Sequence, residues 1–196
     1  HKIALVMPSG QNSFYVNAEH GLAYYDFIND ELPRWAEMNF PLLEGRENRF
    51  IAGLSMGGYG AIRHGLGTPE KYAAVGAFSG ALDIVGLESV LKRVPGMRNI
   101  VDYDSIFGGA DKIEGTDNDL FTLAESCKNS AKELPKIFIT CGTEDAICYE
   151  MDVKYRDTLL EMGYDVTYFE MPGVHEWKVW NESIRQFMNL IDPENA

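Results

Sequence analysis

The sequence predicts an α/β fold with a mostly parallel sheet, and two patterns support this prediction. Five short runs rich in apolar, β-branched or aromatic residues occupy residues 2–7, 50–54, 73–78, 136–141 and 166–171. Most are continuous rather than alternating, which is typical of strands buried on both faces of a parallel sheet. Stretches with helical spacing lie between the runs, and this alternation indicates parallel strands with helices on both faces. The length of 196 residues fits a single domain spanning residues 1–196.

Four helices are expected between and after these strands. They cover residues 23–40, 57–66, 150–163 and 177–190. Pro33 should break or restart the first helix, because proline in a helix interior removes a hydrogen bond and clashes with the preceding turn. Gly163 is the expected C-cap of the third helix. In the last helix, the predicted core-facing residues are Trp177, Trp180, Ile184, Phe187 and Met188.

Residues 81–131 interrupt the alternation with an insert after the third strand. About fifty residues separate this strand from the next, and residues 102–119 are strongly acidic. A short helix is expected before the acidic part, from apolar Ile84, Val85, Leu87, Val90 and Leu91. Long insertions usually lie over the carboxyl edge of a sheet or beside it, so we interpret the insert as a cap or lid. A solvated loop without a catalytic role is the alternative, and the acidic part lacks the ligand pattern of a calcium loop.

The composition argues against several classes of partner. Lysine and arginine number 17 and aspartate and glutamate 30, which gives a net charge of −13. Phosphate backbones and anionic lipids repel such a chain, so neither nucleic acid nor a membrane is expected as a partner. The three cysteines, Cys127, Cys141 and Cys148, match no disulfide framework and no zinc spacing. We therefore expect reduced thiols, a cytoplasmic location and no metal site.

Residues 53–57, which read GLSMG, are the strongest chemical signal in the chain. They follow a predicted strand and precede a predicted helix. A serine nucleophile on such a strained turn needs small residues two positions away on either side, because the turning backbones nearly touch. Ser55 is therefore the candidate nucleophile, and the Met56 N–H at the helix N-terminus is a candidate oxyanion donor. A tight turn without chemistry is the alternative interpretation.

A serine hydroxyl needs a base, and histidine is the usual one. His1 is terminal, and His20 lies in a polar stretch before the first helix. His64 follows Ser55 by nine residues along a helix, which should place it more than about 10 Å from the turn. His175 directly follows the last strand, at the sheet edge where open α/β folds hold their active sites. We predict His175 as the base.

The base needs an acid that holds its tautomer. Asp145 follows the fourth strand and should lie at the same sheet edge. Glu144 is adjacent, and Asp83 follows the third strand, so both remain alternatives. With Asp145, the order along the chain is serine, acid, histidine, which is the order of α/β-hydrolases rather than of chymotrypsin-like or subtilisin-like proteases.

These motifs resemble the esterase D-like branch of the α/β-hydrolases. The resemblance rests on residues 53–60, 142–145 and 173–177, with further agreement at 6–10, 12–15 and 31–34, and it extends over nearly the whole chain. Within the branch, the chain is most similar to bacterial tributyrin esterases and to feruloyl or acetyl-xylan esterases. The resemblance implies an α/β-hydrolase fold, Ser55 as nucleophile, His175 as base, Asp145 as acid, and ester hydrolysis without a metal or organic cofactor.

The sequence departs from this family at its front. Members of the branch carry further strands upstream, one of which ends in a His-Gly loop that supplies a second oxyanion N–H. No His-Gly pair precedes residues 2–7 here. We therefore expect a missing N-terminal segment, and a separate segment or another chain that completes the sheet beside residues 50–54.

The expected function is hydrolysis of small acyl or aryl carboxylic esters through an acyl-enzyme. Phe14, Tyr15 and the insert are candidates to line the substrate pocket. One alternative is a thioesterase or acyltransferase on the same triad, such as an S-formylglutathione hydrolase-like enzyme. Another is a fragment that keeps the fold without turnover. The expected partner is a small ester substrate, and a homo-oligomer stays open.

Overall fold

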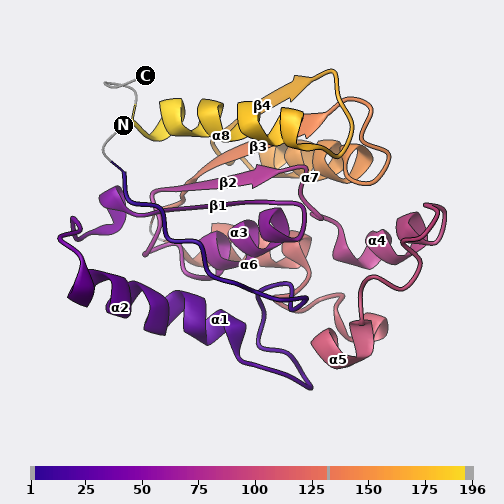
Figure 1. Ribbon diagram of the computed structural model, residues 1–196, viewed down its shortest axis with the longest axis horizontal. Helices are drawn as coiled ribbons and strands as arrows, with labels where there is room; N and C mark the ends of the chain where they lie inside the picture. Colours follow the sequence, from indigo (N-terminus) through magenta and orange to yellow (C-terminus); the bar gives the residue numbers. More distant parts are fainter. Residues whose placement is uncertain (1–2, 132, 193–196) are drawn as a thin grey trace.

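A computed structural model describes residues 3–131 and 133–192. Its centre is a four-stranded sheet with the order β1-β2-β3-β4 (Figure 1). The strands are β1 (Phe50–Leu54), β2 (Ala74–Phe78), β3 (Lys136–Gly142) and β4 (Val166–Met171). All three pairings are parallel, which confirms the predicted α/β class.

Helices cover both faces of the sheet, and the chain alternates between strand and helix from β1 onward. The α-helices are α1 (Tyr24–Asp26), α2 (Leu32–Asn39), α3 (Met56–Gly67), α4 (Ile84–Leu91), α5 (Tyr103–Phe107), α6 (Leu120–Ser130), α7 (Tyr149–Glu161) and α8 (Trp177–Ile191). A π-helix at Phe27–Glu31 joins α1 to α2, and short 3₁₀ turns occupy Arg46–Asn48 and Ala110–Lys112.

Alternate side chains of the strands enter two separate cores. Val75 and Ile137 belong to the larger core, which they share with α3, α6 and α7. Phe78 and Phe138 point to the other face, where they pack around Phe187 of α8. Figure 1 shows α8 on one side of the sheet and α3 and α6 on the other. The sheet is thus covered on both faces, which is why its strands read as continuous apolar runs.

The predicted strand at residues 2–7 is wrong for residues 3–7, and Lys2 lies outside the described residues. Residues 3–7 belong to no strand and do not pair with β1, and Met7 is 86% exposed. A strand needs a neighbour to bond its backbone groups. Among the described residues, β1 pairs with β2 alone and forms an edge of the sheet. The apolar character of residues 2–7 therefore does not by itself create a strand.

One expectation about the helices is confirmed, and one needs correction. The first helical region restarts at Pro33 as predicted, because Pro33 stands in the first turn of α2, directly after the π-helix, where a helix needs no N–H from it. In α8, Trp177 is 66% exposed and Ile184 is also exposed. The fully buried residues of α8 are Val179, Ser183 and Phe187. Ser183 is buried because its hydroxyl bonds both Thr140 and the Val179 carbonyl.

The insert at residues 81–131 divides into two parts. Helices α4 and α5 lie beyond the carboxyl ends of the strands, at the right of Figure 1. Helix α6 returns beneath the sheet and contacts α3 and α7, so it contributes to the larger core. Among the described residues, no helix is both long and apolar enough to cross a membrane.

Candidate active site

Ser55 occupies a strained turn between β1 and α3. Its backbone has φ 53° and ψ −118°, a region that residues with a side chain rarely adopt. A Cβ at Gly53 would collide with the carbonyl of Gly57, which explains the predicted need for small residues on either side. Gly58 lies against the backbone of Gly80 in the same way. The turn thus holds Ser55 at the carboxyl edge of the sheet.

His175 links Ser55 to Asp145 through two hydrogen bonds. Its Nε2 lies 3.0 Å from Ser55 Oγ, and its Nδ1 lies 2.7 Å from Asp145 Oδ2. Because an ionised carboxylate only accepts, Nδ1 must donate its proton to Asp145, and Nε2 is left free to accept the proton of Ser55. This arrangement is the tautomer that a general base requires.

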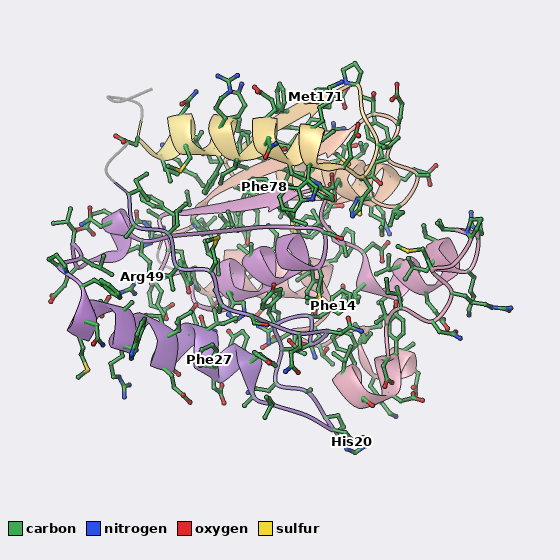
Figure 2. All side chains as sticks on the ribbon, in the orientation of Figure 1. Phe14, His20, Phe27, Arg49, Phe78 and Met171 are labelled. Carbon is green, nitrogen blue, oxygen red and sulfur yellow. The ribbon has the colours of Figure 1, made fainter. Side chains whose placement is uncertain are left out.

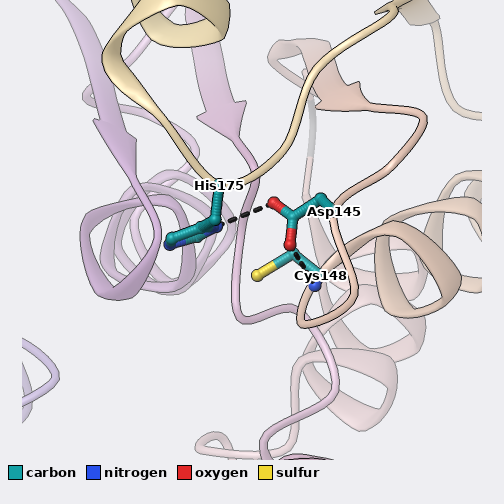
Figure 3. Close-up of side chains that lie close together, drawn as sticks. All are labelled: Asp145, Cys148 and His175. Carbon is teal, nitrogen blue, oxygen red and sulfur yellow. Dashed lines mark hydrogen bonds and ion pairs between the residues drawn. The ribbon is translucent and has the colours of Figure 1, made fainter. Parts of the chain in front are cut away.

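Asp145 is buried and held from both sides, as Figure 3 shows for the bonds to His175 and Cys148. Oδ2 accepts from His175, and Oδ1 accepts from the backbone N–H groups of Ile147 and Cys148, each at 3.0 Å. Burial alone would raise the pKa of Asp145, but the hydrogen bonds and the nearby histidine outweigh it and lower the pKa below its ordinary value. Asp145 therefore stays ionised beside His175.

The competing residues lie elsewhere. Glu144 is exposed, and Asp83 caps α4 through the Gly86 N–H while it pairs with Lys154 at 2.7 Å. Figure 2 shows His20 at the outer tip of the segment before α1. His64 is buried in α3, where its Nε2 lies 3.0 Å from the Tyr15 carbonyl. His1 lies outside the described residues.

Met56 is the first residue of α3. Its N–H therefore has no acceptor within the helix, and it stands at the positive end of the helix dipole. It lies next to Ser55 on the wall of the same cavity. This position suits the N–H to stabilise the oxyanion that develops on a carbonyl oxygen when Ser55 attacks the carbonyl carbon.

A cavity of about 100 Å³ opens beside Ser55, Met56 and His175. The insert contributes much of its wall, as the sequence predicted for this segment. The other lining residues are Asn12, Phe14, Ala81, Leu87, Leu91, Met97, Ile100, Val101, Ile147 and Cys148. A larger hollow of about 520 Å³ lies between the ends of α3 and α6, but neither Ser55 nor His175 lines it. The smaller cavity is therefore the relevant one, because only it touches the reactive groups.

Phe14 and Tyr15 have different places around this cavity. Phe14 lines it and packs edge-on against Tyr59, with the ring centroids 5.4 Å apart. Tyr15 is not among the lining residues, and its ring fills the space beside Gly10 and Gly60. Gly60 therefore makes room for the ring of Tyr15.

The cavity includes residues that sequence reasoning did not single out. Asn12 lines it and donates from Nδ2 to the Ile100 carbonyl at 2.8 Å, which joins the N-terminal loop to the insert. Ile147 and Cys148 line it because they follow Asp145 in the turn whose N–H groups hold that carboxylate. The only sequence signal for these two was their distance of two and three residues from Asp145.

A family model named Esterase, described as "Putative esterase", matches residues 2–189. An acetyl esterase of Caldicellulosiruptor saccharolyticus is 34% identical over 188 residues, which cover 94% of this chain and 70% of that protein. The chain belongs to this esterase family. It is a carboxylic ester hydrolase.

Solved structures of the same fold support the assignment. The substrate-bound fluorophosphonate-binding serine hydrolase F of Staphylococcus aureus has a TM-score of 0.83 and 28% identity, over 94% of this chain and 69% of that one. An S-formylglutathione hydrolase of Staphylococcus aureus has a TM-score of 0.79 and 29% identity, over 94% of this chain and 70% of that one. A ferulic acid esterase at 22% identity and TM-score 0.71, over 90% of this chain and 63% of that one, shares the fold. The esterase thus has the α/β-hydrolase fold that its motifs predicted.

Proposed function

We propose that this esterase hydrolyses small carboxylic esters with Ser55 as nucleophile, His175 as general base and Asp145 as the orienting acid. The observation that carries the proposal is the unbroken hydrogen-bonded chain from Ser55 Oγ through His175 to Asp145, at the wall of a cavity. A serine hydroxyl becomes a useful nucleophile when a correctly oriented base takes its proton.

The reaction follows from this geometry in two steps. Ser55 Oγ attacks the ester carbonyl while His175 Nε2 takes its proton, and the Met56 N–H stabilises the oxyanion. His175 then protonates the leaving alcohol, and an acyl group remains on Ser55. Water enters, loses a proton to His175 and releases the acid. Throughout, Asp145 stabilises the imidazolium without itself taking the proton.

The substrate proposed is an ester of a short acyl group, such as acetate. The cavity beside Ser55 measures only about 100 Å³ and its wall includes Phe14, Leu87, Leu91 and Ile147. A small apolar cavity favours short acyl chains over bulky aromatic ones. The similarity to an acetyl esterase is consistent with this preference.

A thioesterase acting on S-formylglutathione is the second candidate. It is favoured by the similarity to an S-formylglutathione hydrolase at 29% identity and a TM-score of 0.79. The formyl group is smaller than acetyl, so the same cavity admits it. The two candidates share every residue of the proposed triad and differ in the leaving group.

One panel of substrates separates these functions. Hydrolysis is measured on p-nitrophenyl acetate, p-nitrophenyl butyrate, a feruloyl ester and S-formylglutathione. The proposal expects the highest kcat/KM on the acetyl ester, whereas a preference for S-formylglutathione would favour the second candidate. A fluorophosphonate probe should label the wild type at Ser55 and leave Ser55→Ala unlabelled. Absence of both labelling and turnover would indicate a non-catalytic fold.

A further inference from the structure

Asp145, Cys148 and His175 form a cluster with three different ligand atoms. A carboxylate oxygen, the thiol sulfur and an imidazole nitrogen all lie within 4.8 Å of one another (Figure 3). Cys148 is buried, and it lines the cavity beside Ser55. Its backbone N–H holds Asp145, but the proposed ester hydrolysis gives its thiol no task.

We propose that these three side chains form an inhibitory site for Zn²⁺. Imidazole, thiolate and carboxylate are the ligands that zinc takes in proteins, and three protein ligands leave a fourth position for water from the cavity. The proposal rests on the proposed function, because it turns the base of the triad into a metal ligand.

In the proposed site, zinc would be bound by Nδ1 of His175, a carboxylate oxygen of Asp145 and the sulfur of Cys148. The present distance of 2.7 Å from Nδ1 to Oδ2 suits a hydrogen bond. Two ligands at about 2.0–2.1 Å from zinc in a tetrahedron stand about 3.3 Å apart, so the ring and the carboxylate must separate slightly. His175 can do so because it lies in the loop between β4 and α8. Asp145 keeps its other oxygen on the N–H groups of Ile147 and Cys148 during this change.

Two proton transfers explain why bound zinc would inhibit ester hydrolysis. The Cys148 thiol releases its proton to solvent when its sulfur binds zinc. The proton on His175 Nδ1 moves to Nε2, so that the Nδ1 lone pair can bind the metal. Nε2 then carries a hydrogen and faces Ser55 as a donor. It can no longer accept the Ser55 proton, and acylation stops.

Enzyme kinetics with cysteine variants test the site. The rate on p-nitrophenyl acetate is measured after EDTA treatment and then against increasing Zn²⁺, each variant relative to its own zinc-free rate. Wild type should lose activity and regain it when EDTA is added again. Cys148→Ser should need at least about tenfold more zinc for half-inhibition, because a hydroxyl is a far poorer zinc ligand than a thiolate. Cys127→Ser is the matched control, since Cys127 is also a buried free thiol but lies in α6.

Equal zinc sensitivity of wild type and Cys148→Ser would overturn the proposal, because zinc would then act through His175 without the thiol. If Cys148→Ser does not fold, as judged by circular dichroism, Cys148→Ala replaces it under the same criteria.

A spectroscopic measurement distinguishes failure of this site from failure of the proposed function. Co²⁺ replaces zinc as the probe, and a cobalt–thiolate bond absorbs in the near ultraviolet. The band should appear in wild type, in Cys127→Ser and in Ser55→Ala, and should be lost in Cys148→Ser or its alanine replacement. Ser55→Ala has no triad activity but retains all three ligands. If wild type binds Co²⁺ without this band, the thiolate ligand is excluded and the proposal fails.

Discussion

The loop after β4 holds His175, and the middle of α3 holds His64. The two histidines differ in their exposure to the cavity and in the hydrogen-bond partners of their ring nitrogens. The side chain of His175 is 21% exposed, and both of its ring nitrogens meet side chains at the cavity. His64 is 1% exposed and stacks on Tyr25 with ring centroids 4.7 Å apart. Its Nε2 faces the Tyr15 carbonyl, and its Nδ1 has no hydrogen-bond partner among the described residues.

The surroundings of His64 keep it neutral. Burial, opposed only in part by the bond to Tyr15, lowers its pKa from 6.5 to about 4. The neutral ring can donate from Nε2 to the Tyr15 carbonyl, and so it holds the loop that contains Gln11, Phe14 and Tyr15. These three residues all have positive φ, at 48°, 50° and 58°. The same residue type therefore serves as a proposed base in one place and as a loop anchor in the other, according to what surrounds it.

Of the changes around His175, Ser55→Ala is expected to have the largest effect on ester hydrolysis. This change removes the nucleophile and should lower kcat on p-nitrophenyl acetate by about 10⁴ to 10⁶. Thermal unfolding should stay close to wild type, because the change removes one hydroxyl from the wall of a cavity and leaves the packing of the turn in place. Full activity in this variant would show that Ser55 is not the nucleophile, and His175 would then no longer be distinguished from His64 as a catalytic base.

Asp145→Asn should have the next largest effect, a loss of about 10³ to 10⁴ in kcat. The amide keeps the place of the carboxylate but stabilises the wrong tautomer of His175. Glu144→Gln and Asp83→Asn are matched controls, since Nδ1 of His175 bonds to Asp145, while Glu144 is exposed and Asp83 pairs with Lys154. A greater loss in either control than in Asp145→Asn would identify a different acid.

The His64 region should make stability depend on pH. The folded protein binds fewer protons at His64 than the unfolded chain between pH 6.5 and about 4, so the free energy of unfolding falls as the pH falls through this window. From pH 7.5 to pH 5, this contribution is about 2 kcal/mol. Urea unfolding at both pH values measures it. His64→Gln should remove it, and an unchanged difference between the two pH values in that variant would contradict a neutral, buried His64.

The smallest effect on ester hydrolysis is expected from substitutions of His64. His64→Ala removes the donor to the Tyr15 carbonyl and should loosen the loop that carries Phe14. A lost bond to a partly buried acceptor costs up to about 1–3 kcal/mol, but the loop keeps its other contacts. We therefore expect a two- to tenfold loss in kcat/KM, mainly through KM. His64→Gln can donate from its amide and should recover most of this loss. A fall in kcat as large as that of Asp145→Asn would show that His64 takes part in the chemistry.

Much of the fold was predictable because its signals are local. The strands at 50–54 and 166–171 have the predicted bounds, and β2 and β3 differ from prediction by one residue at one end. Residues 3–7 are apolar like the strands of the sheet, but they pair with no strand among the described residues. The face of α8 was mispredicted because the buried hydroxyl of Ser183 depends on a partner in β3, which helical spacing does not reveal.

By itself, the sequence predicted the parallel α/β architecture, the strained turn at Ser55, His175 as the proposed base and Asp145 as one of three candidate acids. These follow from periodicity, glycine spacing and position after a strand, all of which are readable along the chain. Only the tertiary structure decided that His64 anchors the Tyr15 loop, that Asn12 joins this loop to the insert, and that the Cys148 thiol lies beside the proposed triad. The physical reason is that these contacts join segments far apart in the sequence, and the burial and hydrogen bonds that define them exist only when the chain is folded.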